Sequence, residues 1–242
     1  MLKTDNIEIN EKPAIQVKKL RKEYIMGEEK VVALKDINLS INKGEICCIF
    51  GTSGSGKSTL LNQLAGLEKP TRGQVIIGGV SVSRLDENQL AVFRQKHVGF
   101  VFQSYNLLPE LTALENVAMP LMFRGMPKEI REREAMKMLA RVGLKDRLYH
   151  FPGQMSGGQQ QRAGIARAFI TRPDIVFADE PTGNLDSKTT KEVMEMIRSF
   201  ARKFNQTIVL VSHDSEMTEY ADRIVTLMDG EIISDIRTGN NF

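Results

Sequence analysis

The chain has 242 residues, of which 41% are hydrophobic and 26% charged, proportions that are ordinary for a globular protein. Its 33 basic and 30 acidic side chains give a net charge of +3, and dispersed basic residues of this kind do not indicate a nucleic acid partner. No apolar run reaches the ~20 residues of a membrane-spanning helix, and the polar N-terminus lacks a secretory signal. We therefore expect any membrane role to depend on a partner.

The first half of the chain predicts strands that a glycine-rich loop interrupts. Residues 1–14 show little periodicity and indicate an extension ahead of the fold. Leu60, Leu61 and Leu64 recur at helical spacing and predict a helix that ends before Pro70. The apolar runs that predict strands are 14–20, 31–41, 46–50, 73–79 and 98–103.

The second half alternates between helices and strands. A helical pattern runs from about Leu111 to Leu148, and another follows at 158–171. Helices are also expected before and after the strand at 207–212. The remaining apolar runs that predict strands are 175–179, 223–228 and 231–236. This order favours an α/β fold with a mainly parallel sheet and a helical insertion near 104–160.

Cys47 and Cys48 are neighbours in the short apolar run 46–50. Adjacent strand residues point to opposite faces, so we expect two separately buried thiols rather than a disulfide or a metal site. Free thiols fit a reducing compartment.

Residues 51–58 read GTSGSGKS and fit the pattern GxxxxGK[ST]. Glycines let the chain wrap tightly, so that successive N–H groups and the N-terminus of the next helix converge on an anion. Lys57 can then reach the β- and γ-phosphates, and the Ser58 hydroxyl can ligate Mg²⁺. The alternative is a structural turn, but a strand before the loop and a helix after it favour a phosphate-binding loop.

Acidic residues follow the apolar run 175–178 directly. Asp179 should lie at the end of this strand and bind Mg²⁺, and Glu180 could polarise an attacking water. His213 comes just beyond the strand at 207–212 and could hydrogen-bond the γ-phosphate or hold Glu180 in place. The alternatives are a solvated acidic pair and a surface histidine.

A second anion-ready turn begins the helix near 158. Ser156, Gly157 and Gly158 stand about a hundred residues beyond the glycine-rich loop. One nucleotide could contact both the glycine-rich loop and this turn only if they came from different subunits. This suggests two chains arranged head to tail with ATP between them. The alternative is an ordinary helix cap.

In combination, these motifs resemble the nucleotide-binding subunit of an ATP-binding cassette (ABC) transporter over about residues 15–236. The resemblance implies a P-loop ATPase with a RecA-like mixed-sheet core, an N-terminal antiparallel β subdomain and an α-helical subdomain inserted at about 104–160. Residues 1–14 would then be an extension and residues 237–242 a tail.

The resemblance also assigns roles to single residues. It implies catalytic roles for Glu180, His213, Lys57 and Gln103, and Mg²⁺ binding by Ser58, Gln103 and Asp179. Met155 stands where the usual signature loop has leucine, and we expect this apolar substitute to keep the phosphate contacts intact. The residues implied to bind ATP are Tyr24, Gly51, Thr52, Ser53, Gly54, Ser55, Gly56, Lys57, Ser58, Thr59, Ser156, Gly157, Gly158, Gln159 and Asp186, with Tyr24 stacking on adenine.

Within the family, the sequences GFVFQSYNLLPELTALENVAMPL and ADEPTGNLDS look most like the group that releases lipoproteins, exports macrolides or expels haem. The resemblance implies an ATP-dependent homodimer at the cytoplasmic face of the cell membrane, driving a separate permease. We expect the permease to contact about residues 104–122 and the methionines at 119, 122, 126, 136, 138 and 155, with core packing as the alternative for each methionine.

Other functions remain open from the sequence. Cell-division subunits share much of the pattern, so the chain could be an ATP-driven transmembrane signalling switch without net transport. A non-membrane ABC ATPase acting on ribosomes or DNA is disfavoured, because the chain has a single phosphate loop and no sustained heptad tract.

Overall fold

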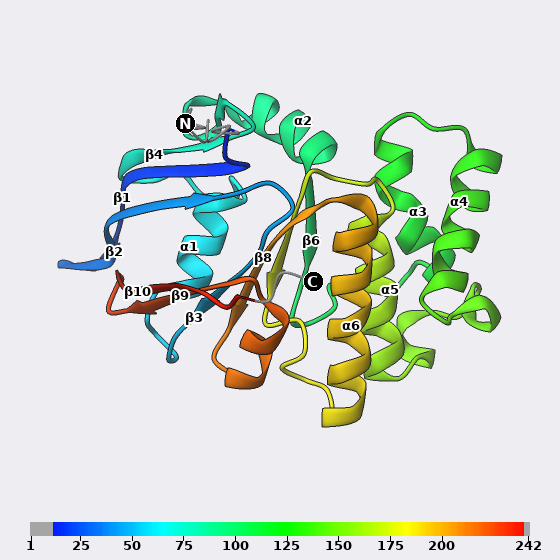
Figure 1. Ribbon diagram of the computed structural model, residues 1–242. Helices are drawn as coiled ribbons and strands as arrows, with labels where there is room; N and C mark the ends of the chain where they lie inside the picture. Colours follow the sequence, from blue (N-terminus) through cyan, green and yellow to red (C-terminus); the bar gives the residue numbers. More distant parts are fainter. Residues whose placement is uncertain (1–11, 240–242) are drawn as a thin grey trace, which may run out of the picture.

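The computed structural model describes residues 12–239, so most of the expected N-terminal extension and the end of the expected tail lie outside the described residues. Two sheets and a group of helices make up this part of the chain (Figure 1). The smaller sheet is four-stranded and antiparallel, in the order β2-β1-β4-β5. Its strands are β1 (Ile15–Met26), β2 (Glu29–Ile41), β4 (Arg72–Ile77) and β5 (Val80–Ser81).

The larger sheet has six strands in the order β10-β9-β3-β8-β7-β6. Neighbours from β9 to β6 are parallel, and only β10 at the edge is antiparallel. These strands are β3 (Ile46–Phe50), β6 (Val98–Val101), β7 (Ile175–Asp179), β8 (Thr207–Ser212), β9 (Arg223–Met228) and β10 (Glu231–Arg237). The sequence patterns predicted each of them to within a few residues, because buried parallel strands are continuously apolar.

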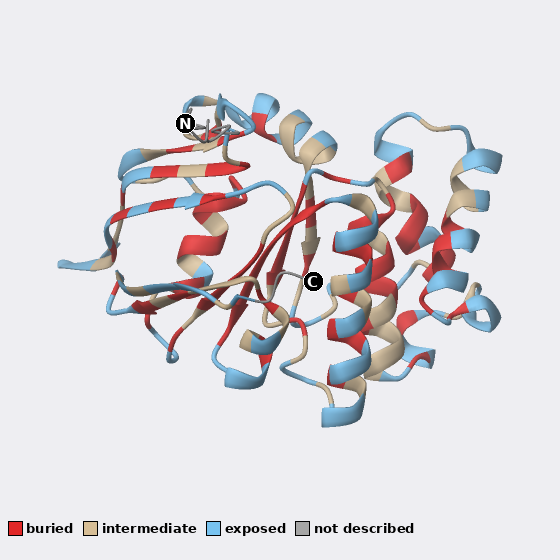
Figure 2. Ribbon diagram, in the orientation of Figure 1, coloured by how far each residue is buried: buried red, intermediate tan, exposed pale blue. Residues whose placement is uncertain are grey.

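Alternate residues of the central strands enter two different hydrophobic cores. Cys47 and Phe177 belong to the core shared with the four-stranded sheet, whereas Cys48 and Val176 belong to the core beneath the helices. Both thiols are fully buried and free, as expected, and burial raises the pKa of Cys48 to about 12. The central sheet is therefore covered on both faces, which Figure 2 shows as buried residues running along its strands.

The helices divide between these two faces. Helix α1 (Lys57–Leu64) packs between the sheets through Leu60, Leu61 and Leu64. On the opposite face lie α5 (Gly157–Phe169) and α6 (Ser187–Phe204), and α3 (Ala113–Phe123) and α4 (Lys128–Arg141) pack beyond α5 (Figure 1). The short 3₁₀ helices are η1 (Val82–Arg84), η2 (Lys145–Arg147), η3 (Pro152–Gln154) and η4 (Ser215–Tyr220).

Two elements differ from the sequence-based expectation. Helix α2 (Glu87–His97) was not expected, although its capping box, in which Asp86 and Gln89 accept each other's backbone N–H, is a readable signal. The helix expected after 207–212 is only η4. Few residues separate β8 from β9, so the chain turns back before a longer helix can form.

Within residues 12–239, no helix combines the length and the apolarity that a membrane span requires.

We expect Phe177→Ala to lower the free energy of unfolding by about 3–5 kcal/mol, because it leaves a cavity in the middle of the central sheet. Phe177 is fully buried, whereas Phe123 is 63% exposed. The matched variant Phe123→Ala should therefore cost about 0.5 kcal/mol or less. Urea titration of both variants measures the difference, and equal losses would contradict the core described above.

Candidate functional site

The glycine-rich loop connects the end of β3 to the start of α1. Gly54 and Gly56 have φ values of +79° and +100°, in the left-handed region that favours glycine. An added Cβ would lie 2.3 Å from the Leu227 carbonyl oxygen at Gly51, and 2.7 Å from the Ala33 carbonyl oxygen at Gly56. The loop can take this shape only with glycine at these positions.

A cavity of about 470 Å³ lies against this loop. Lys57 is buried there and its ammonium donates to the Thr52 carbonyl at 2.7 Å, which shows that it curls back over the loop. The Ser55 hydroxyl is also buried and has no hydrogen-bond partner among the described residues. An ammonium, an unpaired hydroxyl and a glycine cradle at a helix N-terminus fit an oxyanion such as a phosphate.

Other segments line the same cavity and were not singled out in the sequence. They are residues 31–33 and Lys35 of β2, and the turn Asp229–Gly230 between β9 and β10. The Gly230 N–H donates to the Ser55 carbonyl at 3.0 Å, so this turn supports the loop directly. The Asp-Gly pair between two apolar runs signals a hairpin, but nothing in the sequence shows that the hairpin touches the loop.

Asp179 ends β7 beside the loop. The Ser58 hydroxyl donates to its carboxylate at 3.2 Å. Burial raises the pKa of Asp179, and the adjacent Glu180 charge adds to this, whereas Ser58 and Lys57 oppose it. Hydroxyl and carboxylate oxygens are ligands that Mg²⁺ prefers, so this pair fits the expected metal.

Glu180 and His213 meet at the carboxyl ends of the neighbouring strands β7 and β8. A Glu180 carboxylate oxygen lies 2.8 Å from His213 Nδ1. The Glu180 backbone has a φ of +41°, unusual for a residue with a side chain, and its N–H donates to the Val211 carbonyl at 3.1 Å. Of the two contacts considered for His213, the structure contains the one with Glu180.

Gln103 follows β6, at the same edge of the sheet. Its carbonyl accepts a hydrogen bond from the Asn184 side chain at 3.1 Å. Its side-chain amide lies against Gly183, where an added Cβ would come within 2.8 Å of Gln103 Nε2. The structure thus joins Gln103 to the segment after Glu180, with its amide directed at the backbone of that segment.

The next residues of this loop are tied to α5. Tyr105 and Asn106 have φ values of +59° and +51°, and the guanidinium of Arg167 donates to their carbonyls at 3.0 and 2.6 Å. Arg167 links the end of β6 to α5, a connection that the sequence did not reveal.

Ser156 caps the N-terminus of α5. Its hydroxyl accepts from the Gln159 N–H at 3.3 Å, and its own N–H donates to the Gln159 side chain at 3.0 Å. Gly157 and Gly158 pack closely against Tyr105 and Thr189, respectively. The turn at residues 156–158 and helix α1 lie on opposite faces of the six-stranded sheet. The turn therefore does not line the 470 Å³ cavity of its own chain.

The remaining residues expected to contact the nucleotide lie in the loop, in the first turn of α1 and at the start of α6. Thr52 and Ser53 are exposed in the loop, and Thr59 is half-buried in the first turn of α1. Asp186 caps α6 by accepting hydrogen bonds from the Lys188 and Thr189 N–H groups.

Tyr24 is half-buried on β1 and pairs across the ladder with Val31, which lines the cavity. Its hydroxyl donates to a carboxylate oxygen of Glu68 at 2.8 Å. The expected adenine platform therefore lies next to the cavity rather than in its wall.

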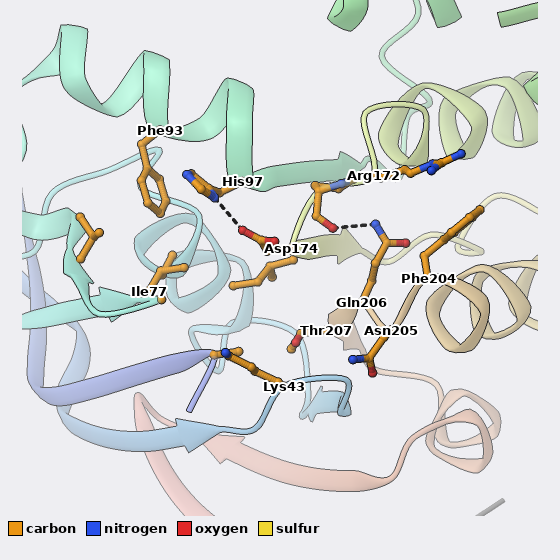
Figure 3. Close-up of a pocket in the computed structure, with 15 residues that line it drawn as sticks. Lys43, Ile77, Phe93, His97, Arg172, Asp174, Phe204, Asn205, Gln206 and Thr207 are labelled. Atoms are coloured by element: carbon orange, nitrogen blue, oxygen red, sulfur yellow. Dashed lines mark hydrogen bonds and ion pairs between the residues drawn. The ribbon is translucent and has the colours of Figure 1, made fainter. Parts of the chain in front are cut away.

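Another cavity, of about 480 Å³, lies at the amino ends of β7 and β8 (Figure 3). His97 Nδ1 lies 2.6 Å from Asp174, and the Gln206 amide donates to the Pro173 carbonyl at 2.6 Å. Parallel α/β sheets bind ligands at the carboxyl ends of their strands, and none of the expected site residues lines this cavity.

The ABC transporter family model matches residues 34–183, which is more than half of the chain. The chain belongs to the ABC transporter family. An uncharacterised ABC transporter ATP-binding protein of Methanocaldococcus jannaschii is 51% identical over 222 residues, covering 92% of this chain and 99% of the relative. A macrolide export ATP-binding/permease protein, MacB, of Vibrio parahaemolyticus is 46% identical, covering 91% of this chain and 34% of the relative.

Solved structures agree with this assignment. A dimeric ATP-binding cassette in a post-hydrolysis state, bound to ADP and Pi, superposes with a TM-score of 0.87 at 43% identity, covering 92% of this chain and 98% of that one. The expected P-loop ATPase fold is confirmed, and so is the expected function of an ATP-hydrolysing ABC transporter motor. The roles of single residues stay predictions.

We expect Asp179→Asn to raise the melting temperature of the nucleotide-free protein at neutral pH while weakening Mg²⁺-dependent ATP binding. A raised pKa means that folding disfavours the ionised carboxylate, so this group costs stability once the pH exceeds its ordinary pKa. The amide removes that cost together with the negative charge. Thermal unfolding of both proteins at pH 5 and pH 8 measures the difference in melting temperature. The increase caused by Asp179→Asn should be larger at pH 8.

Proposed function

We propose that the protein is an ATP-dependent homodimer that drives a separate membrane permease in export. Each ATP would be held by residues 51–58 of one chain and by residues 156–159 of its partner. The observation that carries this proposal is the placement of these segments at opposite faces of one sheet. The cavity against residues 51–58 is not lined by residues 156–159, and a second chain would supply that half. The solved cassette described above is itself a dimer.

On the first chain, the cradle and Lys57 would bind the β- and γ-phosphates. The position of Gly54, Gly56 and Lys57 in the wall of the cavity supports this role. Lys57 would exchange its bond to the Thr52 carbonyl for a phosphate oxygen. The ammonium would then face an anionic oxygen in place of a neutral carbonyl, so both partners of the new contact carry charge.

Magnesium would be held by Ser58 and Asp179, whose side chains already meet. When bound, the ion would neutralise negative charge on the phosphates. Gln103 is the third ligand that the family resemblance implies. Its side chain is exposed and lies against Gly183, so it would have to turn away from that backbone.

Glu180 would accept the proton of the attacking water. His213 supports this role because its contact with the Glu180 carboxylate fixes the orientation of that group. Lys57 of the same chain and Ser156 of the partner chain would offset the charge on the transferring phosphoryl group. Release of phosphate after hydrolysis would remove charge that joins the chains, so the dimer would open.

The permease would contact the surface around α3, in the region 104–122. Leu108 and Met122 are 42% and 45% exposed, and Phe123 next to them is 63% exposed. Arg167 would couple this surface to the nucleotide, because it holds the loop that carries Gln103. The macrolide exporter relatives are ATP-binding/permease proteins of which this chain spans about a third, which supports a membrane partner at the cytoplasmic face.

The methionines of this region divide between the two expected roles. Met138 and Met155 are buried in the core beneath the helices, so packing explains them and Met155 fills an apolar position. Met122 and Met136 are exposed and are available to a partner. Met119 and Met126 are partly buried.

We expect Glu180→Gln to bind ATP but to stall hydrolysis, giving a dimer that persists in ATP. Adding Ser156→Arg to this variant should abolish the dimer, because the bulky side chain blocks the partner's half of the site. Size-exclusion chromatography with and without ATP measures both results. Glu219→Gln, an exposed acid on η4, is the control. Undiminished hydrolysis by Glu180→Gln would contradict the assignment of the base.

We expect Leu108→Glu and Met122→Glu to reduce the permease-stimulated ATPase rate while leaving the basal rate unchanged. A charge on an apolar docking surface opposes association. Val92→Glu on α2 is the matched control, because Val92 is 50% exposed and lies outside this surface. The measurement is ATP turnover with and without the co-purified permease in detergent. Full stimulation of both variants would show that the permease docks elsewhere.

A further inference from the structure

The hydroxyl of Tyr24 makes a hydrogen bond that none of the sequence motifs predicts. It donates at 2.8 Å to Glu68, a residue distant in sequence, in the turn that follows α1. Glu68 belongs neither to the phosphate loop nor to the acidic pair at the end of β7. The contact joins the four-stranded sheet to the helix that begins with the phosphate loop.

The carboxylate of Glu68 is held on the helix side by α1. The side-chain amides of Asn62 and Gln63 donate to it at 3.3 and 3.5 Å. The backbone N–H of Glu68 also donates to the Asn62 carbonyl at 3.4 Å. Because Asn62 and Gln63 lie on α1, the carboxylate keeps a defined position relative to the loop at the start of that helix.

The ring of Tyr24 is held on the sheet side by Lys22. These residues stand two apart on β1 and therefore share a face of the strand. The Lys22 ammonium lies 5.0 Å from the ring centroid and 3.2 Å from the Glu68 carboxylate, and it donates to the Lys69 carbonyl at 2.9 Å. One face of the ring is therefore occupied by a cation, which leaves only the other for a stacked base.

The ladder between β1 and β2 is irregular just before Tyr24. The pairing of β1 with β2 shifts register between Leu20 and Lys22 and again between Lys22 and Glu23. Bulges of this kind interrupt the ladder and bend the strand. The hydrogen bond to Glu68 therefore ties the part of β1 beyond these bulges to the segment that follows α1.

The negative charge of Glu68 strengthens its hydrogen bond with Tyr24. Partial burial alone would raise its pKa, but the hydrogen bonds from Tyr24 and Lys22 bring the pKa of the carboxyl below its ordinary value. The group is therefore ionised at neutral pH and accepts a charge-assisted hydrogen bond from the phenol.

We infer that Glu68 is a positioning residue for adenine: through its hydrogen bond to Tyr24 it sets the distance and angle between the stacking ring and the phosphate loop. The inference rests on the proposed ATP site. A nucleotide has a limited length from base to phosphates. The Tyr24 ring on the four-stranded sheet must therefore be aligned with the phosphate loop that follows β3 of the six-stranded sheet. Glu68 supplies that alignment, and the Lys22 ammonium contacts both the Tyr24 ring and the Glu68 carboxylate.

The test is a double-mutant cycle on ATP affinity with Tyr24→Phe and Glu68→Gln, measured by isothermal titration. Each variant should weaken ATP binding roughly 3- to 10-fold, less than the full value of a hydrogen bond to a charged group, because the stacking ring is misaligned and not removed. The double variant should be no weaker than either single one, because both remove the same contact. The turnover number at saturating ATP should be unchanged, so the effect appears in KM alone.

A second ligand separates positioning from general damage. Inorganic tripolyphosphate has no base, so its affinity should be the same in all these variants. Glu87→Gln is the matched control, since Glu87 pairs with Lys69 at 3.7 Å but is largely exposed. Equal loss of ATP and tripolyphosphate affinity, or fully additive losses in the cycle, would overturn the inference. If Glu68→Gln does not fold, Tyr24→Phe alone must still show the loss for ATP and none for tripolyphosphate.

Tyr24→Ala distinguishes this inference from the proposed site. If Tyr24→Ala leaves ATP affinity unchanged, Tyr24 is no adenine platform, and both that assignment and the inference fall. If Tyr24→Ala weakens ATP binding but Glu68→Gln does not, the platform stands and the role of Glu68 is wrong.

Discussion

The nucleotide site depends on the contact between the glycine-rich loop and the backbone of two other strands. At Gly51 the loop approaches the Leu227 carbonyl on β9, and at Gly56 it approaches the Ala33 carbonyl on β2, both more closely than any side chain allows. Gly230 approaches the same Ala33 carbonyl. These contacts join the two sheets at one point. The loop N–H groups proposed to bind a phosphate converge only while this junction holds.

The parallel sheet arranges the chemistry around that junction. Strands β3, β8, β7 and β6 are neighbours, so their carboxyl ends form one edge. The loop, His213, the acidic pair at 179–180 and Gln103 follow these strands in that spatial order. Glu180 is held there with an unusual positive φ, and such strain is typical of a residue whose carboxylate must point to one place.

The two cores explain why one chain would hold only half of the composite site proposed above. Alternate residues of β3 and β7 enter opposite cores, so α1 with the phosphate loop and α5 with its serine cap are fixed on opposite faces. Arg167 ties α5 to the loop after β6, and Glu68 ties α1 to the ring on β1. Each half of the proposed site is thereby tied to a neighbouring element of its own chain.

The parts of the candidate site that depend on local chemistry can be predicted from the amino-acid sequence. These parts are residues 51–58, Asp179 and the cap at Ser156, because turn geometry, strand ends and helix caps are set by neighbours in the chain. The distant residues that touch them became evident from the folded chain: the Asp229–Gly230 turn, Arg167 and Glu68. These side chains are ordinary in their local sequence. Their roles arise from contacts across dozens of residues, which the packing of two sheets and α1 determines and no local pattern encodes.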